Sequence, residues 1–179
     1  MPSGIYQRKL RQIIIKEDYA LVPLTQGKFA IIDLEDIEKI KDYNWYCQKN
    51  RNTFYANKFS LLKKSKLISL HNIINPPPKN MFNDHIDFDG LNNKKSNLRF
   101  CTHQQNMMNK RKCKNLSSKF KGVTWDESSK KWMSRIRYKN KCYPLGRFKN
   151  EIDAARAYDK KALELFAEFA LTNKMLGLL

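Results

Sequence analysis

Short apolar stretches that alternate with polar residues fill the first part of the chain, and this pattern constrains the fold most. Residues 12–70 contain IIIKEDYALVPL, KFAIIDL, NWYCQK, TFYANKF and KLISLH, separated by turn-like segments such as TQGK and QKNRN. Alternation with a period of two is typical of half-buried strands, so we expect this region to be rich in strands. Residues 34–43 (LEDIEKIKDY) have apolar residues at helical spacing and predict one short helix.

The rest of the chain predicts two further groups of elements. Residues 81–109, after three prolines at 76–78 that favour extended backbone, read as strand, polar loop, strand and helix. Thr102 is the expected N-cap of that helix, with Gln105 placed as in a capping box. Residues 117–173 predict three strands, FKGVTW, KWMSRIRY and KCYPLGRF, and a helix from about 151 to 167. Asn150 is its expected N-cap. The apolar stripe expected on this last helix consists of Ile152, Ala155, Tyr158, Ala162, Leu165 and Phe166.

Charge is the feature of the composition that bears on function. The chain has 35 Lys and Arg against 17 Asp and Glu, a formal net charge of +18. Such an excess predicts a polyanionic partner, nucleic acid first, with a basic protein lacking any specific partner as the alternative. The apolar runs are short, as in residues 13–15, and the N-terminus lacks the apolar segment of a signal peptide, so we expect neither a transmembrane helix nor secretion. The four cysteines form no C-x-x-C pair, which argues against a structural zinc site and for free thiols.

A one-sign basic run crosses the middle of the chain. Residues 90–125 contain no acidic residue. A run of this length repels itself and indicates an anionic partner, although a solvated flexible linker at 110–118 is an equally good interpretation of its centre. The basic residues of the run are Lys94, Lys95, Arg99, Lys110, Arg111, Lys112, Lys114, Lys119 and Lys121.

The residues best suited to catalysis begin with Asp84 and His85. A carboxylate can bind a hard divalent cation while a neutral imidazole takes a proton from water, and adjacent strand residues point to opposite faces. Asn106, on the expected helix, offers a second oxygen to the metal, and Asn97 can hold the polar loop through its backbone. By itself an Asp-His pair is more often a surface turn with a hydrogen-bonded histidine.

The order of these residues along the chain resembles a known nuclease motif. The run HIDFDGLNNKKSNLRFCTHQQNMMN is similar to the HNH (ββα-metal) nuclease motif in the form found in homing endonucleases. The resemblance implies that His85 is the general base, Asn97 the residue that holds the loop, and Asp84 and Asn106 the ligands of one Mg²⁺ or Mn²⁺ per active site. Phe88 departs from the motif, since relatives usually have a small residue such as glycine there.

Two more histidines are candidates for accessory roles. His71 stands where the family usually has a histidine one strand before the metal motif, so it either touches the scissile region or bridges the N-terminal region and the nuclease core. His103 lies three residues before Asn106, on roughly the same helix face, and is a candidate metal or phosphate contact. Met107 and Met108 are expected in the core or an interface.

The C-terminal part resembles the DNA-binding domain of plant ethylene-response (Apetala-type) factors. The matching signatures are KGV at 121–123, KW at 131–132, RIR at 135–137, LG with Phe148 at 145–148, and AARAYD at 154–159. The resemblance implies a three-stranded antiparallel sheet in the DNA major groove with a helix packed behind it. Arg135 and Arg137 share one strand face and suit contacts with guanine, while Ser134, Ile136 and Tyr138 should face the helix. Cys142 and Pro144 replace the Arg and Trp of plant relatives, and Trp132 is expected to pack rather than touch DNA.

Taken together, the sequence predicts an α+β protein that resembles HNH homing endonucleases of phages, other viruses and bacteria carrying such a domain. The expected parts are a strand-rich region with the nuclease core over 1–109 (ββα-metal motif about 70–109), a basic linker over 110–116 and a DNA-binding domain over 117–179. The expected DNA-binding residues are Lys110, Arg111, Lys112, Lys114, Lys121, Thr124, Trp125, Lys131, Arg135 and Arg137.

The predicted activity is metal-dependent hydrolysis of phosphodiester bonds in double-stranded DNA at specific sites, in the cytoplasm of the host cell. A non-enzymatic, sequence-specific DNA-binding regulator with a relic nuclease fold is the alternative, and an RNA-binding protein would also fit the charge. The intact set of Asp84, His85, Asn97 and Asn106 favours the enzyme, because a relic is expected to lose at least one of them. The sequence indicates neither a membrane nor a protein partner.

Overall fold

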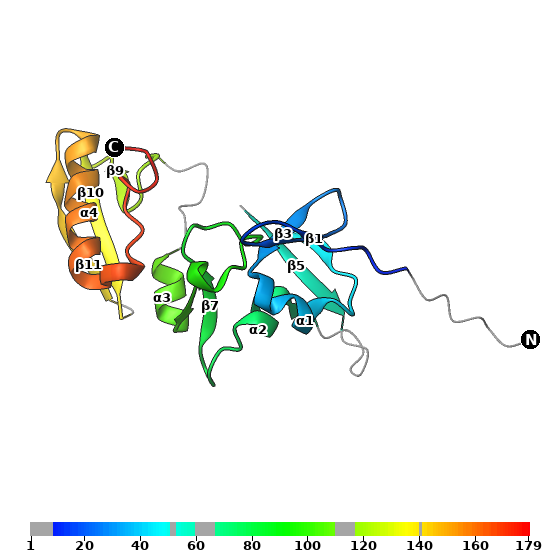
Figure 1. Cartoon of the computed structure of the whole chain (residues 1–179). Coiled ribbons are helices and arrows are strands. Elements are labelled where there is room, and N and C mark those ends of the chain that lie inside the picture. The colour runs from blue at the N-terminus through cyan, green and yellow to red at the C-terminus, as the bar shows by residue number, and fades with distance from the viewer. Residues whose placement is uncertain (1–8, 51–52, 60–66, 110–116, 140) are drawn as a thin grey trace, which may run out of the picture. The chain divides into compact units, whose positions relative to one another are not determined.

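The structure is a computed structural model that describes residues 9–50, 53–59, 67–109, 117–139 and 141–179 (Figure 1). The chain forms two compact units, Met1–Cys101 and Thr102–Leu179. Both combine small antiparallel sheets with short helices, which confirms the α+β class. None of the helices that the structure describes is long and apolar enough to cross a membrane.

The first unit contains three small sheets, ordered β1-β2-β3, β4-β5-β6 and β7-β8, and every neighbouring pair is antiparallel. Its strands are β1 (Ile14–Ile15), β2 (Ala20–Pro23), β3 (Phe29–Ile32), β4 (Tyr46–Asn50), β5 (Thr53–Phe59), β6 (Leu67–Ser69), β7 (Phe82–His85) and β8 (Leu98–Cys101). Its helices are the 3₁₀-helix η1 (Leu34–Asp36), α1 (Ile37–Ile40), α2 (Leu70–Ile74) and the 3₁₀-helix η2 (Lys95–Asn97). The strand-rich N-terminal region and the short helix at 34–43 are therefore confirmed.

One predicted strand is wrong at its end, and the error concerns a candidate site residue. The stretch KLISLH was expected to be extended throughout, but α2 begins at Leu70 and carries His71. Leu70 and Ile74 are four residues apart and both are buried in the core. A helix places residues at this spacing on one face, so burial of both favours the helix over the strand.

Trp45 lies at the centre of the first unit's core, 1% exposed. Its indole Nε1 donates a hydrogen bond to the Ile40 carbonyl at 3.1 Å, so the polar edge of the ring is satisfied. The same core contains Leu70 from α2 and Leu98 from β8. It thereby joins the N-terminal sheets to the elements on either side of β7.

The second unit is a three-stranded antiparallel sheet with β10 in the middle and α4 packed on one face (Figure 1). Its elements are α3 (His103–Met108), β9 (Val123–Asp126), β10 (Lys131–Tyr138), β11 (Lys141–Phe148), α4 (Glu151–Phe166) and the 3₁₀-helix η3 (Ala167–Phe169). The three strands and α4 lie where the sequence places them. The Asn150 side chain accepts a hydrogen bond from the Ile152 amide at 2.8 Å, which confirms this N-cap.

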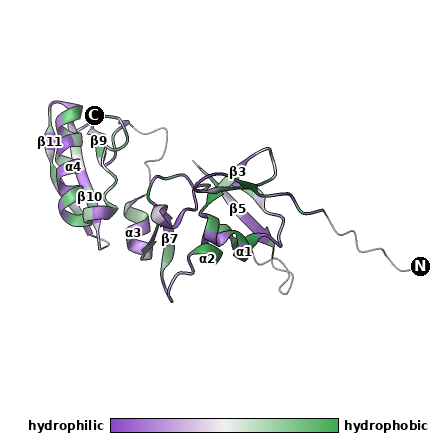
Figure 2. Ribbon diagram, viewed as in Figure 1, coloured by the Kyte–Doolittle hydropathy of each residue, from purple (hydrophilic) through white to green (hydrophobic). Residues whose placement is uncertain are grey.

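The face of β10 that was expected to meet the helix does so. Ile136 is 2% exposed and packs in one cluster with Tyr158 and Phe166 of α4, against which Tyr138 is also packed. Figure 2 shows hydrophobic and hydrophilic positions alternating along α4, as an amphipathic helix requires. The expectation for Ile152 is wrong, because its side chain is 41% exposed. At 100° per residue it lies roughly 90° from the centre of the buried stripe.

Gly122 is required by the packing of the sheet on α4. Its φ is +78°, and a Cβ there would lie 1.8 Å from Cδ2 of Tyr158. Every other residue would both strain the backbone and displace the tyrosine ring. The glycine of the KGV signature is thus explained by packing rather than by any contact with a ligand.

Candidate active site

Asp84 and His85 end strand β7, where they pair with Arg99 and Leu98 of β8. Being adjacent in a strand, the two side chains point to opposite faces and enter different surroundings. The His85 residue is 5% exposed, whereas the Asp84 side chain is 11% exposed and lies in an ion pair.

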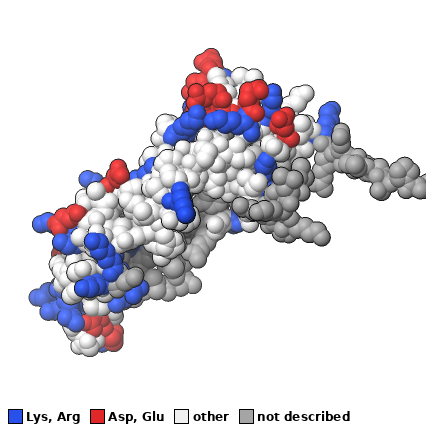
Figure 3. All heavy atoms as spheres, turned by 90° about the horizontal axis from the view of Figure 1, so that it is seen from below, with Lys and Arg blue, Asp and Glu red and all other residues white. Residues whose placement is uncertain are grey.

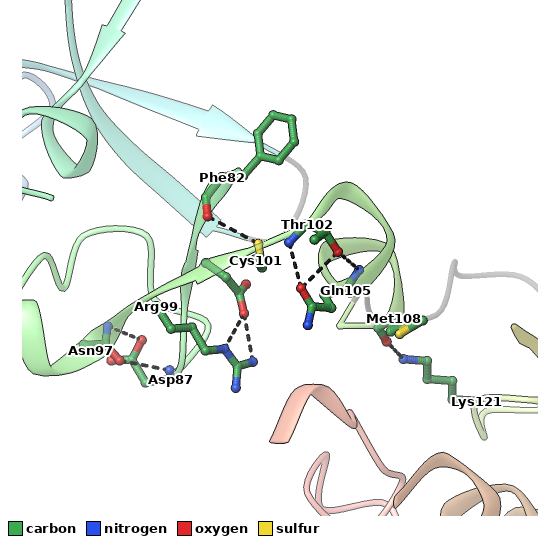
Figure 4. A network of polar contacts seen from close by, with 10 residues as sticks. Phe82, Asp87, Asn97, Arg99, Cys101, Thr102, Gln105, Met108 and Lys121 are labelled. Atoms are coloured by element: carbon green, nitrogen blue, oxygen red, sulfur yellow. Dashed lines mark hydrogen bonds and ion pairs between the residues drawn. The ribbon is translucent and has the colours of Figure 1, made fainter. Parts of the chain in front are cut away.

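Arg99 holds the Asp84 carboxylate. Its Nε and Nη2 both donate to Oδ2 of Asp84, at 3.0 and 2.8 Å (Figure 4). Hydrogen bonds between two charged groups are roughly twice as strong as neutral ones. The carboxylate is therefore fixed in position beside a permanent positive charge.

The opposite face of β7 holds a cluster of three aromatic rings. The His85 ring lies 5.2 Å from that of His71 and 5.7 Å from that of Tyr55, between centroids, and the latter two are 5.8 Å apart. Burial lowers the pKa of His71 to about 3, and the charge that His85 carries when it is protonated lowers it further. Burial also lowers the pKa of His85, although the hydrogen bond to Asn93 and nearby carboxylates oppose the shift. Both imidazoles are thus neutral at neutral pH, and a neutral imidazole can accept a proton.

Asn97 closes the polar loop between β7 and β8. Its Oδ1 accepts a hydrogen bond from the Asp87 amide at 3.0 Å. Its Nδ2 donates to Oδ1 of Asp87 at 2.9 Å and to the Asn92 carbonyl at 2.8 Å (Figure 4). One buried side chain therefore ties both ends of the loop together.

The same loop is fastened to the N-terminal sheets. The Gly90 amide donates to Oγ1 of Thr53 at 2.9 Å, and a Cβ on Gly90 would lie 2.4 Å from the Phe54 carbonyl oxygen. The Asn93 amide donates to the Ile31 carbonyl at 2.8 Å. Strands β3 and β5 thus fix the loop that faces His85, which gives the N-terminal region a structural role in the site.

Phe88 occupies the loop position where the resemblance expects a small residue. Its φ is +66°, in the left-handed region that side chains other than glycine and asparagine rarely adopt. The residue that departs from the motif therefore has a strained backbone. The hydrogen bonds of Asn97 and Gly90 keep the loop in this conformation despite the strain.

The structure brings together Asp84, His85, Asn97 and His71 in the first unit, whereas Asn106 and His103 lie on α3 in the second. Thr102 caps α3 and forms a capping box with Gln105, as expected (Figure 4). Met108 packs against the core of the second unit. Met107 was expected in the core or an interface, and its 49% exposure excludes only the core.

The donor set can be compared with the needs of a divalent cation. In the part of the chain that the structure describes, no three His, Cys, Asp or Glu side chains form a group that could hold a metal ion. The expected ligands are instead one carboxylate and one amide, from Asp84 and Asn106. Such oxygen donors fit Mg²⁺, which commonly takes one or two protein ligands and retains several waters, and they do not fit zinc.

The free face of the C-terminal sheet carries positive side chains. Lys131, Arg135 and Arg137 are exposed along β10, on the face opposite Ile136. Among the described residues, neither arginine forms an ion pair, whereas Arg147 of β11 donates to Asp126 at 2.8 Å. Figure 3 shows Lys and Arg side chains gathered over the second unit on the face drawn there.

Strand β11 is irregular beside the arginines. Arg135 pairs with Pro144 and Arg137 with Cys142, and the register shifts between Ser134 and Arg135. A proline cannot donate to the ladder and is confined to edge strands or bulges, which accounts for the shift. The two residues that replace Arg and Trp of plant relatives therefore flank the exposed arginines.

The remaining predicted DNA contacts differ in placement. Thr124 pairs with Met133 and is half-buried on the free-face side, whereas Trp125 pairs with Trp132, which packs against the core. Nζ of Lys121 donates to the Met108 carbonyl at 2.5 Å, and burial lowers its pKa to about 8 (Figure 4). Four further residues lie outside the described part of the chain: Lys110, Arg111, Lys112 and Lys114.

Sequence reasoning missed Tyr55 and Asn93, and it named Arg99 only as a member of the basic run and not as the partner of Asp84. Arg99 could have been found, because pairing the two expected strands around the polar loop places it opposite Asp84. Tyr55 gave no signal, since its contact with His85 joins residues 30 positions apart in different sheets. Asn93 lies among several asparagines of one loop, and only the fold singles it out.

Comparison with known proteins gives one informative match. The chain is 31% identical over 159 residues to an uncharacterized HNH endonuclease of Acanthamoeba polyphaga mimivirus, and the match covers 88% of this chain and 81% of the relative. No protein-family model matches the chain. No solved structure matches it either.

Proposed function

The chain belongs to the HNH endonuclease family, and we propose that it is a divalent-metal-dependent DNA endonuclease of the homing type. It binds double-stranded DNA at specific sites and hydrolyses phosphodiester bonds there. The order of β7, polar loop, β8 and α3 supports a ββα-metal core. The relative comes from a virus, which supports the proposal that this chain is encoded by a mobile genetic element and acts on DNA inside a host cell.

The observation that carries the proposal is the environment of His85. The ring is buried at the end of β7, its pKa is lowered, and its neighbour Asp84 lies on the opposite strand face. In this state His85 takes a proton from the water that attacks the phosphorus, and the protonated ring is stabilised by the carboxylates of the loop. Asn97 keeps the loop, and hence the ring, in place.

Asp84 and Asn106 would hold the cation, Mg²⁺ or Mn²⁺, and its charge would stabilise the negative charge that develops on the phosphate. His71, packed against His85, remains neutral and shields one side of the ring. A direct contact of His71 or of His103 with the phosphate is a further proposal.

We assign DNA binding to the second unit. The exposed row of Lys131, Arg135 and Arg137 suits the major groove, in which arginine can bond both acceptor atoms of guanine. Thr124 lies beside this row. The lysines of the 110–116 segment would contact phosphates, which adds affinity but no sequence information.

One observation favours the rival function, a DNA-binding regulator that has lost catalysis. The Asp84 carboxylate is bonded to Arg99, a cation that competes with any metal for the same oxygen. In an active enzyme the metal must share or displace this partner. In a relic the ion pair would simply be part of the fold.

Cleavage of supercoiled plasmid with Mg²⁺, compared with EDTA, separates the two functions. We expect nicked or linear product that depends on Mg²⁺ and disappears in His85→Ala, while DNA binding by that variant stays within about threefold of wild type. A general base contributes ~10²–10⁴-fold to the rate and little to ground-state binding. Site-specific binding without cleavage under any metal would establish the regulator instead.

A further inference from the structure

The ion pair between Asp126 and Arg147 joins the two outer strands of the C-terminal sheet. Asp126 of β9 pairs with Lys131 of β10, and Arg147 of β11 pairs with Met133 of β10. Directly paired strand residues point to the same face of a sheet, and so do alternate residues of one strand. Both side chains therefore lie on the free face that carries Arg135, and their contact crosses the central strand.

The Asp126 carboxylate is fixed by the turn that follows β9. Its Oδ1 accepts hydrogen bonds from the amide and the hydroxyl of Ser128, at 3.2 and 2.7 Å. Its Oδ2 accepts from the Ser129 hydroxyl and from Nε of Arg147, both at 2.8 Å. These bonds, of which that from the Ser128 side chain has the largest effect, hold the pKa of Asp126 below its usual range. The acceptor that Arg147 meets is thus fixed in position and stays charged.

The contact with Asp126 occupies only one edge of the Arg147 head group. Nε donates to the carboxylate, and the arginine side chain is 57% exposed. Among the residues that the structure describes, no second acidic side chain pairs with it. A guanidinium bonded through Nε keeps N–H groups on both terminal nitrogens available. Two such groups side by side match the O6 and N7 acceptors of guanine in the major groove.

Fixing an arginine in advance reduces the conformational freedom that it loses when it binds DNA. Arg135 and Arg137 are exposed on the same face without an ion pair among the described residues, so they are less constrained. We infer that Arg147 is a base-reading residue that recognises guanine, and that Asp126 is the positioning residue that aims it. This inference rests on the proposed function, because it presupposes site-specific binding of double-stranded DNA.

A role confined to the hairpin does not account for the pair. The neighbouring Glu127 pairs with Lys130 of the same turn, and both of those side chains are at least 69% exposed. Asp126 is instead 14% exposed, and its arginine lies 21 positions away on a different strand. The serines of the turn already bind Asp126 locally. An acidic group on a face that binds phosphates is repulsive unless it is paired, which gives Arg147 a reason to be there.

The test is selection of duplexes from a randomised DNA library by the full chain, in EDTA so that metal-dependent cleavage cannot occur. We expect the wild-type protein to enrich a motif that contains guanine. Arg147→Ala should lose preference at one guanine by roughly 5- to 150-fold and retain the rest of the motif. Arg147→Lys should lose the same preference but keep its overall affinity, because lysine retains the charge and lacks the paired N–H groups. A motif unchanged in Arg147→Ala would overturn the inference.

Asp126→Asn tests positioning with a readout that a merely structural role would not move. Removing the negative charge should raise the affinity for scrambled duplexes, while the preference for that one guanine falls by about fivefold or more. Unchanged guanine preference, or a fall in affinity for all duplexes together, would reject the positioning role. Arg156→Ala and Asp153→Asn are the matched controls, because they alter an exposed ion pair on α4 and should leave the motif as it is.

The outcomes separate this inference from the proposed function. A motif that needs Arg147, in a protein that cleaves no plasmid with Mg²⁺, supports the inference and rejects the endonuclease. Mg²⁺-dependent cleavage at a motif that is independent of Arg147 rejects the inference and leaves the endonuclease intact. Enrichment of no motif by the wild-type protein overturns the inference together with site-specific binding, but not cleavage itself. If Asp126→Asn does not fold, the two Arg147 variants still decide whether this arginine reads a base.

Discussion

Arg99 donates two hydrogen bonds to a single oxygen of Asp84, at 3.0 and 2.8 Å, across the β7–β8 pair. The carboxylate expected to bind a cation is thus already held by a cation of the protein. Both side chains are mostly withdrawn from solvent, 19% exposed for Arg99 and 11% for Asp84. The pair links the two strands of the hairpin, and it would compete with a metal ion proposed to bind at the same carboxylate.

This competition predicts opposite effects at the two ends of the pair. Asp84→Ala should raise the Mg²⁺ concentration needed for cleavage or abolish cleavage. Arg99→Met should lower the Mg²⁺ requirement, because the competing charge is gone, while reducing the free energy of unfolding by about 1.5–3 kcal/mol. Cleavage rate against Mg²⁺ concentration and urea unfolding measure the two effects. The control Lys94→Met, which breaks an ion pair to the exposed Asp18, should cost at most about 1 kcal/mol.

His71 predicts a specific dependence of stability on pH. Its pKa is lowered from 6.5 to about 3 on folding, so below pH 6.5 the unfolded chain binds a proton that the folded chain does not. The contribution of neutral His71 to the free energy of unfolding is complete above pH 6.5. It decreases as the pH falls below 6.5, by up to about 1.4 kcal/mol per pH unit. His71→Phe should show a shallower decline in urea unfolding over this range. Equal slopes for the two proteins would mean that His71 is not buried in its neutral form.

The arginines of β10 should read sequence. Arg135→Ala/Arg137→Ala should lose preference for the cognate site, because each arginine that bonds a base contributes ~1–3 kcal/mol of discrimination. Weak metal-dependent nicking should persist at low salt. Affinity for cognate and scrambled duplexes, measured against salt, is the test. Arg156→Ala, on the exposed side of α4, is the matched control. Full site preference in the double variant would move sequence reading to the N-terminal strands or to DNA shape.

Phe88 predicts an effect of backbone strain. Phe88→Gly and Phe88→Ala both remove the ring, so their comparison isolates the φ of +66°. The glycine variant should be more stable than the alanine variant by about 1–2 kcal/mol, the cost of a left-handed conformation for a residue with Cβ. Thermal and urea unfolding of the pair test this. Equal stability would show that the loop relaxes to another conformation when the ring is absent.

Much of the fold is local and could therefore be predicted. The three strands of the second unit, the Asn150 and Thr102 caps and the polar loop all depend on residues close together in the chain. Their periodicity and side-chain hydrogen bonds act over a few positions. The adjacency of Asp84 and His85 is likewise a property of the sequence. The wrong expectation for His71 arose because a five-residue helix gives too short a pattern to distinguish it from a strand.

The α+β elements and the positive charge follow from the sequence, and so does the choice of Asp84 and His85 as candidate catalytic residues. Tertiary structure alone decided which of the loop's asparagines faces His85, that His71 and Tyr55 surround its ring, and that Lys121 is held in the second unit's packing. The contacts within the first unit join residues that are 8 to 30 positions apart in the sequence. The contact of Lys121 with Met108 joins residues 13 positions apart. No local periodicity encodes them, because they exist only once the core around Trp45 and the β10–α4 layer have brought distant segments into contact.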